Sequence, residues 1–146
     1  MYSFNSKFGS EGSDVMIYSP NVLVIRNDDY EMLPENDRFY VNVISSAAVD
    51  NREKVANSEI LMERRIRKVI SLAAFKAQQE GKNGKNALIL GAFGCGVFKN
   101  DPNVVAAKFA KILNDEKMKD YFDCVIFPIF NDHNKVWQIF QGCLIK

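Results

Sequence analysis

Apolar and polar residues alternate in a pattern that predicts strands followed by a helix in the first half of the chain. β-Branched and aromatic residues dominate 15–18 and 22–25, and the break at 19–21 predicts two short strands or one bent edge strand. A further strand is expected over 39–44. Apolar residues then recur every three to four positions from Ser58 to about Gln79, with charged residues between them, which predicts a long amphipathic helix.

The second half alternates strand and helix. A short apolar run at 87–90 has the composition of a buried parallel strand, and 124–130 is similar. Asp101 and Pro102 provide an N-cap and a favoured first residue for a helix over about 102–114. The spacing of apolar residues in 136–140 predicts a short closing helix. This alternation indicates a layered α/β fold with at least partly parallel strands, joined by right-handed crossovers.

Length and composition indicate one domain over residues 1–146. Hydrophobic residues make up 47% of the chain, which excludes a disordered protein. Because the formal net charge is only +1, no overall basic field favours nucleic acid or anionic lipid, and we expect no direct nucleic-acid binding. Basic residues do line the helix expected at 58–79, but a solvated charged face is the commoner explanation.

Membrane-spanning, secreted, disulfide-linked and zinc-binding proteins are also disfavoured. The longest apolar stretch, 87–98, is interrupted by glycines and falls well short of the roughly 20 residues that span a bilayer, and the N-terminus has no secretory pattern. Three widely spaced cysteines form neither a disulfide framework nor a CxxC pair, which favours a reducing, cytoplasmic setting. The single His133 cannot build a multi-histidine zinc site, so we expect no metal and no cofactor.

The glycine-rich segment 91–98, between a buried strand and a capped helix, is the motif that carries chemistry. Glycines let an oxyanion approach peptide N–H groups, and a helix N-terminus adds donors, so an anion site for phosphate is predicted. The carboxylate of Asp101 at the N-cap counts against an anion there, although the positive charge of Lys99 could offset it. The dinucleotide GxGxxG pattern and the Walker pattern both fail here. A tight turn without a ligand remains the alternative.

Three segments of the sequence resemble segments of one known protein family. They are Gly91-Ala-Phe-Gly-Cys-Gly-Val-Phe98 with Pro102 soon after; Met16-Ile-Tyr-Ser-Pro-Asn-Val22 leading to Val24-Ile-Arg-Asn-Asp28; and Tyr40-Val-Asn-Val-Ile44 leading to Ala47-Ala-Val49. The first resembles the second phosphate loop of macro domains, the ADP-ribose-binding modules, and all three are similar to the microbial-type poly(ADP-ribose) glycohydrolase branch. The resemblance implies a macro-like three-layer α/β/α domain with a mixed, partly parallel sheet, shortened at its N-terminus.

The resemblance also implies a ligand site. Backbone N–H groups of the loop would hold the diphosphate of ADP-ribose, and Gly91 would let the strand end turn. Phe98 would lie against the distal ribose, and Phe130 and Asn131 would contact the adenosine, with a core position as the alternative for Phe130. The expected ligand-binding residues are Gly91, Gly94, Cys95, Gly96, Val97, Phe98, Phe130 and Asn131.

The sequence departs from that branch in its catalytic signature. Three glycines followed by Gln-Glu-Glu would stand upstream of the segment that begins at Met16, where this sequence has no room for them. Gln78-Gln79-Glu80 lacks the glycine triplet, so the catalytic role is not carried over and the catalytic residue stays unknown. Because glycoside hydrolysis needs a carboxyl group as general acid, we expect binding without turnover.

Three functions therefore remain open. The leading one is a sensor, reader or sponge that binds ADP-ribose, another ADP-ribose-containing small molecule or an ADP-ribosylated protein. The second is a glycohydrolase whose acid is Glu35, Asp28 or Asp29, or comes from a partner chain. The third is a structural or oligomerisation domain that lost its ligand, against which the intact glycine loop argues. A shortened sheet would expose an edge, so self-association is also expected.

Overall fold

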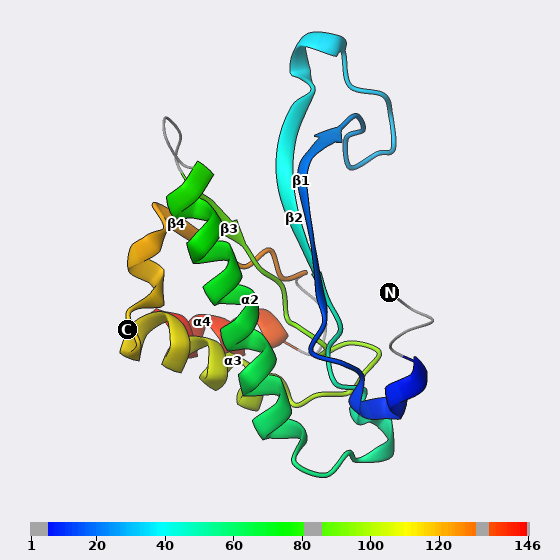
Figure 1. Ribbon diagram of the computed structural model, residues 1–146, viewed down its shortest axis with the longest axis vertical. Coiled ribbons are helices and arrows are strands. Elements are labelled where there is room, and N and C mark those ends of the chain that lie inside the picture. The colour runs from blue at the N-terminus through cyan, green and yellow to red at the C-terminus, as the bar shows by residue number, and fades with distance from the viewer. Residues whose placement is uncertain (1–5, 81–85, 131–134, 146) are drawn as a thin grey trace. The chain divides into compact units, whose positions relative to one another are not determined.

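A computed structural model describes residues 6–80, 86–130 and 135–145 (Figure 1). The chain forms two compact units, one made of Met1–Asp14 and Ala47–Lys146 and the other of Val15–Ser46. Each unit is described by itself below. No helix in the described ranges is both long and apolar enough to cross a membrane.

The smaller unit is a β-hairpin. Strand β1 (Met16–Val24) pairs antiparallel with β2 (Phe39–Ser46), in a register that runs from Met16 opposite Ser46 to Val24 opposite Phe39. The register shifts between Ser19 and Val22. Proline has no N–H to donate and fits at such an irregularity, which explains why the sequence breaks there at Pro20. Of the two expectations for this segment, the single bent strand is confirmed.

The larger unit contains the long helix α2 (Ser58–Glu80), as the apolar spacing predicts. Its buried face is apolar and comprises Met62, Ile66, Ile70 and Ala74. The basic residues of this helix do not all lie on a solvated face. Arg65 is buried, and its Nε donates a hydrogen bond to Asp14 Oδ1 at 3.1 Å. One of the arginines predicted to be solvated therefore anchors the N-terminal segment of its own unit.

The second half of the chain supplies a parallel strand pair and two more helices. Strand β3 (Ala87–Ile89) pairs in parallel with β4 (Cys124–Ile126). Helix α3 (Pro102–Ala110) continues into a π-helical turn at Lys111–Asp115, and α4 (Val136–Leu144) follows later. The elements occur in the predicted order, although β4 ends four residues earlier than expected.

The core of this unit lies between its helices and one face of the β3–β4 pair (Figure 1). Side chains from α2, α3 and α4 are buried together, and Leu88 and Val125 pack against them. Three aromatic rings meet there: the centroid of Phe127 lies 5.1 Å from that of Phe109 and 5.6 Å from that of Phe140. Such edge-on and tilted contacts are favourable for aromatic pairs.

The opposite face of the β3–β4 pair is open. Ile89 is 64% exposed and Ile126 is 46% exposed, and Cys124 is exposed as well. The α/β class with parallel and antiparallel pairing is confirmed, but the two pairings lie in separate two-stranded sheets. Within the described residues, helices cover only one face of the parallel pair.

Candidate functional site

The glycine loop 91–98 follows β3 and precedes α3, as predicted from the sequence. Backbone hydrogen bonds between residues close in sequence shape the loop. Cys95 N–H donates to Ala92 O at 3.0 Å, and Asn100 N–H donates to Gly94 O at 3.2 Å. The loop is therefore a folded turn whose backbone direction is set by its own bonds.

Gly94 is required by packing. Its φ of 73° lies in the left-handed region, and a Cβ added there would lie 2.6 Å from Asn100 Nδ2 and 2.8 Å from the Cβ of Ala48. Asn100 is buried, and its side-chain amide donates to Val49 O at 2.8 Å and to Gly94 O at 3.0 Å. Asn100 thus ties the glycine loop to the segment 47–50. Sequence reasoning missed this residue, and its only signal is an asparagine directly before the Asp-Pro cap.

Gly96 differs from Gly94 in its backbone φ and in the space around it. A Cβ on Gly96 would meet no atom within 4 Å, and its φ is not positive. The residue is exposed, and so is Val97, at 71%. Neither backbone conformation nor packing within the described part of the chain requires glycine at this position. The tight-turn explanation therefore accounts for Gly94 but not for Gly96.

Several N–H groups of the loop lack an acceptor within the ranges that the structure describes. They belong to Gly94, Gly96, Val97 and Phe98, whereas the N–H of Cys95 is already used. Successive backbone N–H groups without an internal acceptor are donors that an anion can use. The arrangement supports recognition of phosphate oxygens by main-chain donors.

Helix α3 does not add its N-terminus freely to this set. The carboxylate of Asp101 accepts a hydrogen bond from Asn103 N–H at 2.8 Å and so caps the helix. This agrees with the argument from sequence that Asp101 counts against an anion at the helix. The donors for an anion are those of the loop.

Phe98 is held in place by the segment that precedes α2. Asn51 N–H donates to Phe98 O at 2.9 Å, and the guanidinium carbon of Arg52 lies 5.8 Å from the centroid of the Phe98 ring. Arg52 also bonds Asp50, with Nε to Oδ1 at 2.8 Å, and this hydrogen bond lowers the pKa of the Asp50 carboxyl. A cation is therefore positioned beside the loop, and sequence reasoning missed it because the two residues are 46 positions apart.

Cys95 provides no reactive group here. Burial, together with the negative charge of Asp101, raises the pKa of the Cys95 thiol to about 11, so the thiol stays protonated at neutral pH. In the parts of the chain that are described, no group of three or more His, Cys, Asp or Glu side chains could hold a metal ion. The loop groups that the structure leaves available to a ligand are the backbone N–H groups described above.

The remaining predicted residues are distributed as follows. Phe130 is 87% exposed, so its ring is not part of the core, and its role as a stacking partner stays a prediction. Asn131 and His133 lie outside the described residues. The candidate acids Asp28, Asp29 and Glu35 belong to the hairpin unit and are exposed.

The elements and the loop define an α/β protein with a macro-domain-like fold. Solved structures of microbial poly(ADP-ribose) glycohydrolases share it. The enzyme of Deinococcus radiodurans in complex with ADP-ribose is 30% identical with a TM-score of 0.83, and the match covers 99% of this chain and 57% of that one. The enzyme of Thermomonospora curvata is 31% identical with a TM-score of 0.79, over 97% of this chain and 52% of that one.

The chain therefore spans just over half the length of the glycohydrolases whose fold it shares. No protein-family model and no curated protein matches the sequence. The resemblance in the glycine loop and the two earlier segments is confirmed at the level of the fold.

Proposed function

We propose that this chain binds ADP-ribose, or a molecule that contains it, through the backbone of the loop 91–98. The observation that carries the proposal is the open, glycine-bearing backbone at Gly96 and Val97, where N–H groups lack acceptors among the described residues. Solved structures of the Deinococcus radiodurans glycohydrolase, which shares the fold, include complexes with ADP-ribose.

In this proposal, the diphosphate accepts hydrogen bonds from Gly94, Gly96, Val97 and Phe98, while Cys95 shapes the turn. Gly91 lets the chain leave β3, and Phe98 lies against the distal ribose. Phe130, whose exposed ring is free of the core, stacks on the adenine together with contacts from Asn131. Arg52, which is paired with Asp50, lies over the Phe98 ring and would flank the ligand on that side.

We further propose that these 146 residues bind without hydrolysis, in a cytoplasmic sensor, reader or sponge. The sequence contains no glycine triplet followed by Gln-Glu-Glu, and removal of a general acid or base typically lowers a rate by about 10²- to 10⁴-fold. The alternative is a glycohydrolase that uses Asp28, Asp29, Glu35 or an acid from another chain, which the names of the solved relatives favour.

Isothermal titration calorimetry with ADP-ribose, followed by chromatography of the same cell, tests both proposals. We expect saturable binding with a Kd in the micromolar range or tighter, and unchanged ligand. Formation of product, or release of ADP-ribose from poly(ADP-ribose), would establish the glycohydrolase instead. No heat at millimolar ADP-ribose would overturn binding of ADP-ribose itself and would leave a larger ADP-ribose-containing ligand or the structural role.

A substitution at Gly96 separates a ligand site from a simple turn. Gly96→Glu places a side chain and a negative charge where the diphosphate is proposed to lie, and we expect at least a hundredfold loss of affinity. Because a Cβ there meets open space, the melting temperature should change little. Gly142→Glu, at an exposed glycine of α4 where a Cβ also meets open space, serves as the matched control. Unchanged affinity in Gly96→Glu would mean that the loop is only a turn.

A further inference from the structure

The side chain of Arg52 lies over Phe98 of the glycine loop. The Phe98 ring is half-buried and packs against the core of the larger unit. The guanidinium carbon of Arg52 is 5.8 Å from the centroid of this ring, and the Arg52 side chain is 54% exposed. A ligand that lies against the loop on the side of Phe98 would therefore contact the guanidinium group as well as the ring.

Asp50 holds this guanidinium group in one orientation. The Nε of Arg52 donates to Asp50 Oδ1 at 2.8 Å, and its Nη2 donates to Asp50 Oδ2. Asp50 Oδ1 also accepts a hydrogen bond from the backbone N–H of Arg52 at 3.3 Å, and Asp50 N–H donates to Ser10 O at 2.8 Å. Because a two-bond pairing of arginine with a carboxylate is geometrically specific, the remaining N–H groups of Arg52 have a fixed direction.

One edge of the guanidinium group is available to a ligand. The Nη1 of Arg52 has no acceptor among the residues that the structure describes. The carboxylate of Asp50 compensates the positive charge, and the carboxylate of Glu53 also acts on it. The group therefore offers directed N–H donors with little net charge. Such donors suit the uncharged hydroxyl oxygens of a sugar better than a further phosphate.

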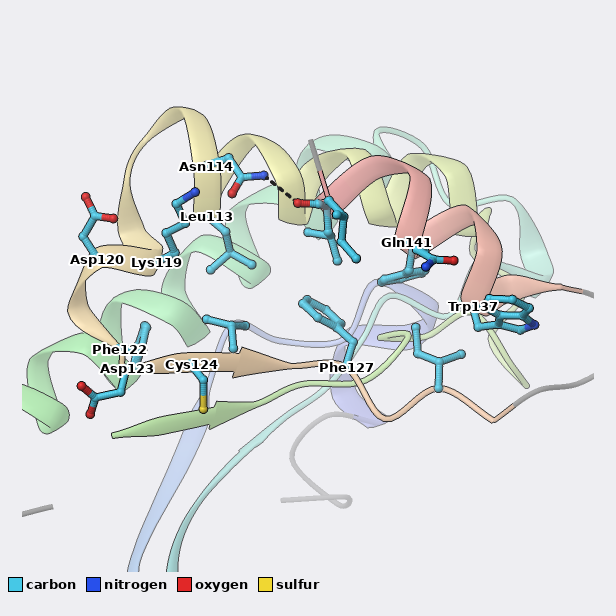
Figure 2. A pocket seen from close by; sticks show the side chains of 15 residues that line it. Leu113, Asn114, Lys119, Asp120, Phe122, Asp123, Cys124, Phe127, Trp137 and Gln141 are labelled. Atoms are coloured by element: carbon cyan, nitrogen blue, oxygen red, sulfur yellow. Dashed lines mark hydrogen bonds between the residues drawn. The ribbon is translucent and has the colours of Figure 1, made fainter. Parts of the chain in front are cut away.

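The groove along β4 receives no wall from this part of the chain (Figure 2). Its volume is about 910 Å³, and Figure 2 shows apolar side chains such as Leu113 and Phe127 around it. Among the described residues that line it, none belongs to the loop 91–98 or to the segment 50–53. Hydrogen bonds to a ligand held by the loop must come from side chains beside the loop, and Arg52 is one of them.

We propose that Arg52, held by Asp50, is a specificity-determining residue that donates hydrogen bonds to the hydroxyl groups of the distal ribose of ADP-ribose. This inference rests on the proposed function, in which the loop backbone holds the diphosphate and Phe98 lies against the distal ribose. The site accordingly selects nucleotides that carry a second sugar beyond the diphosphate. A nucleotide without that sugar binds through the loop and the adenosine contacts alone.

Isothermal titration calorimetry with two ligands of equal charge tests the inference. They are ADP-ribose and the β-methyl ester of ADP, which keeps the diphosphate diester and lacks the distal ribose. Arg52→Gln removes the guanidinium group, and we expect about tenfold weaker binding of ADP-ribose but a change of at most about twofold for the methyl ester. A role of Arg52 in folding or in loop shape would weaken the binding of both ligands alike.

Two further variants separate the directed donors from the positive charge. Arg52→Lys keeps the charge but has no planar fork for Asp50 to hold, so ADP-ribose should bind about fivefold more weakly than to wild type. Asp50→Asn leaves Arg52 in place without its charged partner, and a loss of similar size is expected. In the double variant Asp50→Asn/Arg52→Gln, the loss should be no larger than in Arg52→Gln alone, because both changes remove one interaction.

Arg64→Gln is the matched control. The Arg64 side chain is 53% exposed, and its Nε lies 2.7 Å from Asp14 Oδ2, so it resembles Arg52 in exposure and in pairing. It belongs to α2 and not to the segment 50–53. Binding of both ligands to Arg64→Gln should equal binding to wild type, and circular dichroism should show every variant to be folded.

Three results would overturn the inference and leave the proposed function standing. Arg52→Gln could weaken both ligands equally, it could leave the binding of ADP-ribose unchanged, or Arg52→Lys could bind ADP-ribose as tightly as wild type does. Failure of the wild-type chain to bind either ligand would instead refute the proposed binding of ADP-ribose itself, and the inference with it. The behaviour of the wild-type chain thus distinguishes the two failures.

Discussion

Gly94 and Gly96 are two residues apart and have different reasons to lack a side chain. The first has a left-handed backbone and lies against Asn100 and Ala48, and the second meets open space. The composition of the loop predicts that glycine is needed there, but it cannot separate these two causes. The separation depends on contacts with Ala48 and Asn100, which lie 46 residues before Gly94 and six after it.

A pair of alanine variants tests this difference. Gly94→Ala should lower the free energy of unfolding by about 2 kcal/mol or more, since it adds a strained φ and a steric clash. Gly96→Ala should change it by less than about 0.5 kcal/mol. Urea unfolding monitored by circular dichroism measures both, and equal effects would contradict the distinction.

At the scale of elements, a network of charges joins α2 to α3 and to the turn after it. Glu63 on α2 accepts hydrogen bonds from Lys111 at 2.6 Å and Arg67 at 2.9 Å, and Lys108 on α3 lies 2.9 Å from its carboxylate. The hydrogen bonds from Lys111, Arg67 and Lys108 lower the pKa of Glu63 from 4.5 to about 2. Helix packing in this unit is therefore coupled to the ionisation of one carboxyl group.

The pH dependence of stability follows from this shift. Because the pKa of Glu63 is lower in the folded chain, its contribution is fully present above about pH 4.5 and is lost as the pH falls toward 2. Glu63→Gln should cost about 1 kcal/mol at pH 7, with the difference from wild type shrinking below pH 4. Urea titrations at several pH values measure this. Glu59→Gln, at an exposed site on the same helix, should have little effect at any of them.

The elements differ in how far the sequence predicts them. Helix α2 follows from apolar spacing over 23 residues, and the start of α3 follows from the local Asp101 cap. The end of β4 does not follow from its composition, because the apolar run continues to Phe130 while pairing with β3 stops at Ile126. The length of a strand depends on the strand that pairs with it. The local sequence of β4 does not show where its pairing with β3 stops.

At the scale of the whole molecule, the sequence predicts the fold class through the glycine loop and the two segments that resemble the glycohydrolase branch, and the structural match confirms it. The predicted single domain over 1–146 stays a prediction, as does self-association. The residues that hold the candidate site together, Asn100 and Arg52, were not predicted. Their roles depend on contacts across about 50 residues, for which the sequence carries no periodic signal.

The high pKa of Cys95 has a consequence for the chemical durability of the candidate site. With a pKa of about 11, the Cys95 thiol stays protonated at pH 7, and the thiolate is the form that peroxides and electrophiles attack. The cysteine in the loop is thus protected by its surroundings from oxidative modification. The diphosphate binding proposed for this backbone should therefore be insensitive to thiol oxidants.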